Sequence, residues 1–185
     1  PAVMPKRTNQ AAGQDLVLTS AGNYYEGVTQ AEAEAYYAAH KDDSPEPMWV
    51  GLNSKLTKEN GEVVEKTYKV GGMYGEALAK VVYWLEKALP YAENDEQREA
   101  IEKMIEFNRT GDLRTFNEYC IAWVKDLDSR VDYVNGFTEV YTDPLGITGA
   151  WEAMVNFKDM EATKRTSIIS ANAQWFEDHS TTDPK

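Results

Sequence analysis

The chain has 185 residues, a formal net charge of −12, a hydrophobic content of 42% and an aromatic content of 11%. This length and composition are typical of a globular domain and exclude a mostly disordered chain. The negative charge would repel nucleic acid and anionic membrane surfaces, so neither is an expected partner, and no apolar run approaches the roughly 20 residues of a membrane helix.

The N-terminal third begins with a polar stretch. We expect residues 1–14 to form a tail, and their sequence has neither an initiator Met nor the apolar core of a signal peptide, as expected of a processed or excised piece. Residues 15–28 fit a short helix or an extended segment equally well. Thr29 then begins a helix that runs to about His40, because "TQAE" is a capping box with Glu32 three residues after the cap.

A β-hairpin is predicted over residues 49–70. The turn is centred on Asn60-Gly61, the pair that best tolerates positive φ at both central positions. Three helices follow over residues 72–89, 94–111 and 112–129, each with apolar side chains at helical spacing. Asn94 is the expected N-cap of the second of these helices.

The stretch "NGFTEVYTDPLGITGAWEAM", residues 135–154, combines a strand, a turn and a second segment that is either a strand or the start of a helix. A period of two predicts Phe137, Glu139 and Tyr141 on one strand face. If the turn closes a hairpin, Glu139 and Glu152 would lie nearly opposite each other.

Two facing carboxylates destabilise a sheet. Such a pair persists when a cation neutralises it or when the two carboxylates diverge into solvent. The cation could be an Arg or Lys of the protein, a metal or the ammonium group of a ligand. The alternative interpretation is a pair of surface carboxylates on a half-exposed strand.

A long helix is expected over residues 157–177, with a tail over 178–185. The predicted fold class is therefore α+β, mostly helical with small antiparallel β-hairpins. The only two histidines, His40 and His179, lie far apart and form no H-E-x-x-H motif, so we expect the chain itself to bind no metal. Cys120 is the single cysteine of the sequence, so an internal disulfide is excluded. It lies on an apolar helix face, where thiols are usually inert.

Several segments resemble the dipeptidyl peptidase III family. "GFTEVYTDPLGITGAWEAMVNF" is similar to that family's G-F-x-E-x-Y-x-D-P-x-G pattern with its following aromatic-Glu pair. The predicted hairpin, "ALAKVVYWLEKALPYAEN" and "ATKRTSIISANAQWFEDHS" resemble further segments in the same order, the last as in Bacteroides-type members. The resemblance covers most of residues 15–180.

The resemblance implies a fragment of a two-lobed zinc exopeptidase that releases dipeptides from the N-termini of short peptides. The family's zinc motifs, H-E-x-x-G-H and E-E-x-x-A-[ED], do not occur in this sequence. The zinc would therefore be bound by the remaining lobe of the same polypeptide. On this basis residues 15–156 belong to the lower lobe, residues 157–177 lead to the zinc-bearing lobe, and a cytoplasmic location is expected.

The resemblance also implies three site residues. Glu139 and Glu152 correspond to acids that bind the substrate's N-terminal ammonium, and Tyr141 corresponds to a tyrosine that stabilises the tetrahedral intermediate. The chain alone is predicted to be inactive. Two other readings remain open: a non-enzymatic acidic binding module that docks a cationic partner, and a metal-free pseudoenzyme.

Overall fold

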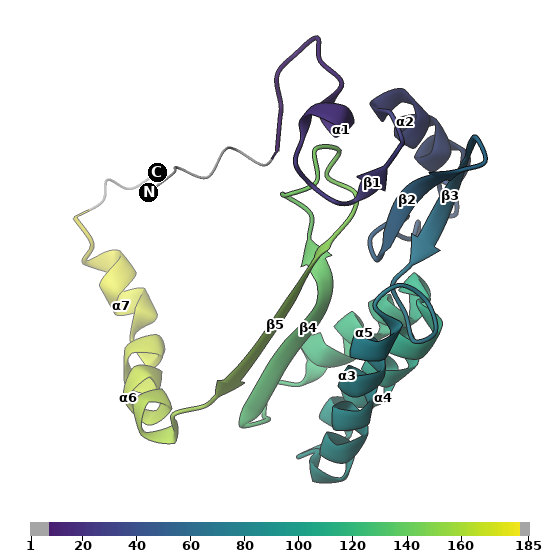
Figure 1. The fold of residues 1–185 in the computed structure, drawn as a ribbon. Coiled ribbons are helices and arrows are strands. Elements are labelled where there is room, and N and C mark those ends of the chain that lie inside the picture. Colours follow the sequence, from purple (N-terminus) through teal and green to yellow (C-terminus); the bar gives the residue numbers. More distant parts are fainter. Residues whose placement is uncertain (1–7, 182–185) are drawn as a thin grey trace, which may run out of the picture.

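In this computed structural model, residues 8–181 are described, and they have the predicted α+β fold class (Figure 1). The chain begins with α1 (Leu16–Thr19), β1 (Tyr25–Glu26) and α2 (Gln30–Ala39). The segment left open by the sequence thus holds both a short helix and a short strand. The capping box is confirmed, since the Thr29 side chain accepts from Glu32 N while the Glu32 side chain accepts from Thr29 N.

The first sheet has three strands in the order β1-β2-β3. β2 (Ser54–Glu59) and β3 (Glu62–Thr67) form the predicted hairpin, with φ of 52° at Asn60 and 91° at Gly61. β1 pairs with β2 in parallel, and α2 packs on the sheet. We call these elements, α1 to β3, the N-terminal layer. Its small core consists of Val28, Ala33, Tyr37 and Leu56.

The three predicted helices are present and form the main core. They are α3 (Gly75–Ala88), α4 (Asp95–Thr110) and α5 (Leu113–Lys125), with a short 3₁₀ turn, η1 (Leu89–Tyr91), after α3. Asn94 caps α4 by accepting from Gln97 N, and Gly111 ends it with φ of 73°. The buried side chains at their interface are Val82, Leu85, Ala100, Ile101, Met104, Ile105, Phe107, Phe116, Tyr119 and Ala122.

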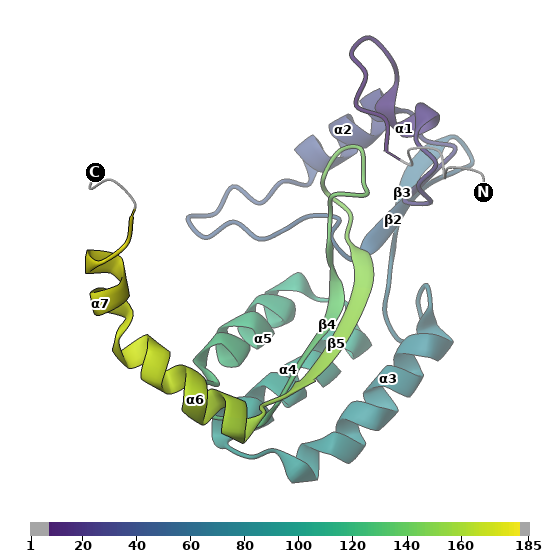
Figure 2. The same cartoon turned by 90° about the vertical axis from the view of Figure 1, so that its left-hand side faces the viewer.

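The second sheet is an antiparallel hairpin of β4 (Val131–Glu139) and β5 (Ala150–Phe157). The segment after the turn is therefore a strand rather than a helix. Phe137 joins this hairpin to a further small core by packing with Tyr68 and Leu78. Figure 2 shows the hairpin running from the N-terminal layer down to the level of α3 and α4.

The single helix expected over residues 157–177 is replaced by two helices, α6 (Met160–Ala171) and α7 (Ala173–Asp178). Phe157 belongs to β5, and Asp159 caps α6 by accepting from the backbone nitrogens of Glu161 and Ala162. The chain leaves helical geometry at Asn172. α7 extends one residue into the stretch expected to be tail.

We call residues 160–178 the arm and residues 8–157 the body. In the arm every residue except Ala162 is exposed, and Figure 1 shows it standing apart from α3, α4 and α5. Parts of the two predicted tails, residues 1–7 and 182–185, lie outside the described residues. Within residues 8–181, no helix has both the length and the apolar composition needed to cross a bilayer.

Candidate functional site

The register of the β4–β5 hairpin determines which side chains share a face. Phe137 pairs with Trp151, their ring centroids 5.0 Å apart, and Gly136 pairs with Glu152. The register then shifts, because Glu139 pairs with Ala150. Thr138 is the extra residue of a β-bulge, a local insertion that changes which face the following residues occupy.

The prediction that Phe137, Glu139 and Tyr141 share one strand face is wrong for two reasons. The bulge moves Glu139 to the face of Ala150, whereas Phe137 stays on the face of Trp151 and is buried. β4 also ends at Glu139, so Tyr141 lies in the connection between the strands rather than on a strand.

The same bulge brings the two predicted carboxylates to one face. Ala150 and Glu152 are two residues apart on β5 and therefore point to the same side, which is also the side of Glu139. The carboxylates are diagonal neighbours rather than directly opposite, a relation that separates Cα atoms by roughly 7–8 Å.

Both carboxylates are half-buried and lack a protein counter-ion in the described part of the chain. Thr138 Oγ1 donates to Glu152 Oε1 at 2.9 Å. None of the ion pairs among residues 8–181 includes Glu139 or Glu152. Two uncompensated negative charges on one face favour a cationic ligand over a neutral or anionic one.

Tyr141 lies in the turn over residues 140–149, with 73% of its surface exposed. Its neighbours are fixed more firmly than it is. The Thr142 hydroxyl is hydrogen-bonded to the Tyr24 hydroxyl, and Asp143 N donates to Val140 O at 3.0 Å. The residues next to Tyr141 are thus hydrogen-bonded, whereas its own side chain is exposed.

Asp143 holds this turn together, and sequence reasoning did not single it out. The residue is 2% exposed, and its carboxylate accepts from the backbone nitrogens of Leu145, Ile147 and Thr148 at 3.1, 2.9 and 2.8 Å. The Tyr25 hydroxyl donates to the same carboxylate at 2.9 Å. The available signal was the Asp-Pro pair that opens the turn, since Asp side chains often accept from backbone nitrogens a few residues on.

The turn is also tied to the N-terminal layer through its last residues. Gly149 N donates to Leu52 O at 2.7 Å, and the buried Thr148 hydroxyl is 3.4 Å from the Tyr37 hydroxyl. A Cβ atom at Gly149 would lie 2.5 Å from Phe137 O, so this close approach requires glycine. Figure 1 shows the turn beside α1 and β1.

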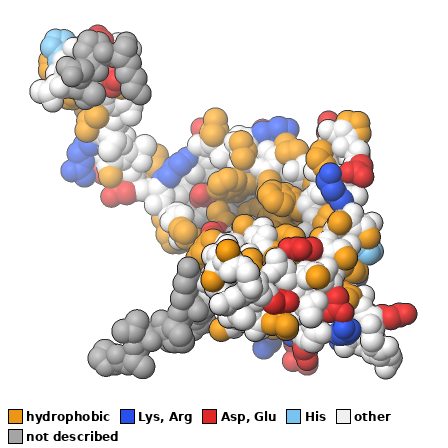
Figure 3. Space-filling view, turned by 90° about the horizontal axis from the view of Figure 1, so that it is seen from above, with side chains coloured by type: hydrophobic (Ala, Val, Ile, Leu, Met, Phe, Trp, Pro, Cys, Tyr) orange, Lys and Arg blue, Asp and Glu red, His pale blue; other side chains and the backbone are white. Residues whose placement is uncertain are grey.

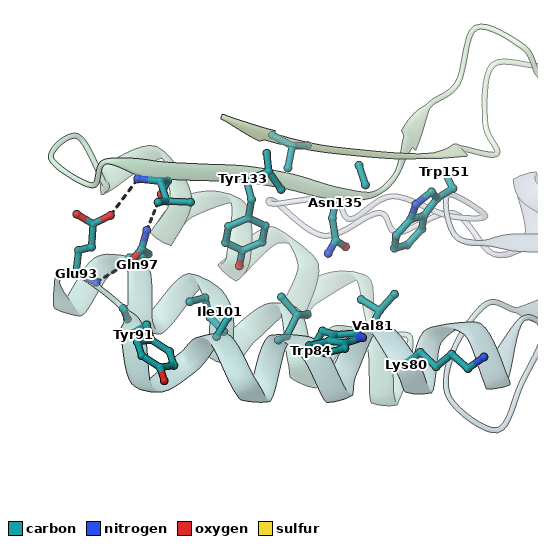
Figure 4. A pocket seen from close by; sticks show the side chains of 17 residues that line it. Lys80, Val81, Trp84, Tyr91, Glu93, Gln97, Ile101, Tyr133, Asn135 and Trp151 are labelled. Atoms are coloured by element: carbon teal, nitrogen blue, oxygen red, sulfur yellow. Dashed lines mark hydrogen bonds between the residues drawn. The ribbon is translucent and has the colours of Figure 1, made fainter. Parts of the chain in front are cut away.

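A cavity of about 730 Å³ lies on the face of the hairpin opposite to Glu139 and Glu152, between β4, β5 and α3 (Figure 4). Its walls are mostly apolar, and they include Val81, Trp84, Ile101, Trp151 and Val155. Tyr133 Oη and Asn135 Oδ1 are buried there without a hydrogen-bond partner among the described residues. In the space-filling view, hydrophobic side chains gather around a hollow in the middle of the face (Figure 3).

Residues 26–178 match Peptidase family M49. This chain belongs to that family. Its curated M49 relatives include dipeptidyl peptidase 3 of Dictyostelium discoideum, 33% identical over 112 residues, and that of Rattus norvegicus, 37% identical over 103 residues. These matches cover 59% and 54% of this chain but only 16% and 14% of the relatives, so the M49 chain spans a small part of their length.

Two solved structures share the fold of this M49 chain. Dipeptidyl-peptidase III from Corallococcus sp. strain EGB matches with a TM-score of 0.61, covering 89% of this chain and 31% of that one. DPP III from Caldithrix abyssi matches with a TM-score of 0.65, covering 85% and 29%. Both are 23% identical in sequence. The family match and the curated relatives confirm the resemblance to the dipeptidyl peptidase III family that was first drawn from motifs.

The two histidines of the M49 chain lie at helix ends, and its cysteine is partly buried. His40 and His179 follow the last turns of α2 and α7, where their Nδ1 atoms donate to Tyr36 O at 2.8 Å and Trp175 O at 2.7 Å. Burial raises the pKa of the Cys120 thiol, which disfavours the reactive thiolate. Within residues 8–181, no group of three or more His, Cys, Asp or Glu side chains could hold a metal ion.

Proposed function

We propose that this chain is the part of a dipeptidyl peptidase that binds the free amino end of a short peptide. The observation that carries the proposal is the bulged register, which sets Glu139 and Glu152 on one face with no described cationic partner. A peptide ammonium has the charge and the hydrogen-bond donors to match this pair. Charge-assisted hydrogen bonds of this kind contribute about 1.5–3 kcal/mol each.

The removal of dipeptides requires the enzyme to measure two residues from the amino end. Two extended residues span at most ~7 Å. Tyr141 follows Glu139 by two residues, so a peptide held at Glu139 and running along the turn would bring its second carbonyl near the phenol. This spacing supports a role for Tyr141 at the scissile bond.

In this role Tyr141 donates a hydrogen bond to the oxyanion that forms during hydrolysis. The phenol O–H of a tyrosine can act as such a donor. A donor aimed at the developing charge stabilises the transition state more than the ground state, which raises kcat rather than affinity.

The other parts of the enzyme would come from polypeptide outside this chain. The described residues offer no ligand set for the zinc that the family resemblance implies, so the zinc belongs to the remaining lobe in this proposal. The arm, with its exposed apolar side chains, would lead into that lobe. A cytoplasmic location stays a prediction.

The carboxylate role is tested in the full-length enzyme with Glu139→Gln and two substrates, one with a free amino end and one acetylated there. We expect the KM of the free peptide to rise by about 10- to 150-fold, the equivalent of 1.5–3 kcal/mol. The KM of the acetylated peptide should change little, because it has no ammonium. Glu99→Gln, an exposed site on α4, is the control. An unchanged KM for the free peptide would reject the role.

The phenol role is tested with Tyr141→Phe, which removes one donor and keeps the ring. Loss of one oxyanion donor costs about two orders of magnitude in kcat. Tyr91→Phe, at a position 83% exposed on η1, is the matched control. A kcat equal to that of the parent enzyme would remove Tyr141 from the mechanism.

The fragment interpretation has its own test. We expect no turnover when this chain alone is incubated with zinc and a dipeptidyl-naphthylamide, because the metal ligands lie elsewhere. Substantial turnover would overturn this interpretation. The gene should also encode an H-E-x-x-G-H motif beyond Lys185, and a continuation without those histidines would indicate a pseudoenzyme.

A further inference from the structure

We infer that Asp143 is the positioning residue of the site. It accepts a hydrogen bond from Tyr25, and this bond attaches the turn in which Tyr141 lies to the N-terminal layer. The inference rests on the proposed function, since it assigns to Asp143 an effect on catalysis that passes through Tyr141. Asp143 itself faces away from solvent and touches no substrate in this arrangement.

The first support is the convergence of four donors on one buried carboxylate. Oδ2 accepts from the Tyr25 hydroxyl and from the backbone nitrogens of Ile147 and Thr148, and Oδ1 accepts from Leu145 N. No ion pair among residues 8–181 includes Asp143. The carboxylate is therefore satisfied by oriented hydrogen-bond donors, which hold the turn in one conformation.

The second support is the distance that this contact bridges along the chain. Tyr25 lies on β1 and precedes Asp143 by 118 residues. Leu145 and Ile147 of the turn pack against the same small core as the Tyr25 ring. Burial, with the negative charge of Asp143 nearby, raises the pKa of Tyr25, so its hydroxyl remains a donor across the working range of pH. Polar and apolar contacts thus fix the turn to the same strand.

The third support is that Tyr141 has little else to position it. The side chain is 73% exposed, and no hydrogen bond of its phenol to another described residue is present. The location of the phenol therefore follows the backbone of the turn. A displacement of about 1 Å at a reacting group can cost roughly 100-fold in rate, so a looser turn should lower kcat.

Asp143→Asn is the discriminating substitution, because it keeps the shape but replaces one acceptor oxygen with a donor NH₂ facing other donors. In the full-length enzyme we expect kcat to fall about tenfold or more. In a Tyr141→Phe background, the same substitution should lower kcat less than twofold, because the group that it positions is gone. Asp128→Asn, at an exposed site, should leave kcat unchanged in both backgrounds.

An equal fold-loss in the two backgrounds would overturn the inference, because Asp143 would then act on the enzyme generally and not through Tyr141. If Asp143→Asn fails to fold, Tyr25→Phe serves instead. It removes only the donor on β1 and should give the same pattern with a smaller loss of kcat, about two- to fivefold. A full kcat for both variants would also reject the inference.

A measurement that needs no activity separates this inference from the proposed function. In this chain, amide hydrogen exchange at residues 145–148 should accelerate at least tenfold in Asp143→Asn, less in Tyr25→Phe and not at all in Asp128→Asn. If Tyr141→Phe leaves kcat unchanged, the proposed function of Tyr141 fails. If Tyr141→Phe lowers kcat but exchange does not change in Asp143→Asn, only the present inference fails.

Discussion

The two ends of the β4–β5 hairpin contrast sharply. At one end, the turn over residues 140–149 contains polar residues that are nevertheless buried, since Asp143 and Thr148 are 2% and 0% exposed. At the other end, the strand passes into the arm, where large apolar side chains such as Trp175 and Ile168 are 56% and 65% exposed. Burial here follows the presence of neighbours rather than the polarity of the segment.

The contrast separates what this chain packs against itself from what it leaves exposed. The turn has partners within the body, from Tyr25 to Leu52. The arm has no comparable packing among the described residues, and isolated helices shorter than about 12–15 residues are marginal in water. The stability of the body and the helicity of the arm should therefore respond to different substitutions.

The largest expected difference is between two methionines. Met104, on α4, is 0% exposed, and Met160, at the start of α6, is 51% exposed. Met104→Ala should lower the free energy of unfolding by about 2–5 kcal/mol, because it leaves a cavity in the main core. Met160→Ala should stay within about 0.5 kcal/mol. Urea unfolding of this chain, followed by far-UV circular dichroism, measures both.

A loss of more than 1 kcal/mol in Met160→Ala would contradict the separation of arm and body. In that case the arm would contribute to the cooperative unit. A small loss in Met104→Ala would instead show that the core of α3, α4 and α5 collapses around the cavity.

The sequence predicted the features that depend on residues close together in the chain. The capping box at Thr29, the Asn60-Gly61 turn and the end of α4 at Gly111 each involve groups within a few positions. Their chemistry is local, so distant parts of the fold do not alter it.

Features set by distant partners were missed. The bulge at Thr138 depends on how β4 pairs with β5, and an extra residue in a strand leaves no mark on its polar pattern. In the sequence Asp143 is an ordinary turn residue, because its hydrogen bond from Tyr25 joins positions 118 residues apart. The role of the two carboxylates stays a prediction, but the regular strand face on which their selection was first argued is wrong.

A second, smaller difference is expected between two glycines at the border of the turn and the N-terminal layer. Gly51 and Gly146 have φ of 79° and 67°. A Cβ atom at Gly51 would lie 2.5 Å from Tyr37 Cε1, whereas nothing lies within 4 Å of one at Gly146. Both alanine variants carry the strain of a left-handed backbone, about 1–2 kcal/mol. Gly51→Ala should lose a further 1–3 kcal/mol from overpacking.

The difference between these two variants isolates the contact from the backbone strain, and thermal unfolding measures it. Equal losses would show that the Tyr37 ring moves aside at no cost. The turn would then be packed less tightly on the N-terminal layer than the close approach at Gly51 indicates.

The smallest effect concerns two helix caps. Thr29 caps α2, which packs on the body, and Asp159 caps α6, which belongs to the arm. Thr29→Ala should lower the free energy of unfolding by about 1 kcal/mol, the usual cost of losing a cap. Asp159→Ala removes the same kind of contact, but the arm is not part of the packed unit. Its loss should therefore appear as reduced helicity over residues 160–171 in NMR Cα shifts, with the unfolding midpoint unchanged. If Asp159→Ala instead lowered the midpoint as much as Thr29→Ala, α6 would unfold together with the body, and the arm would not be separate from the packed unit.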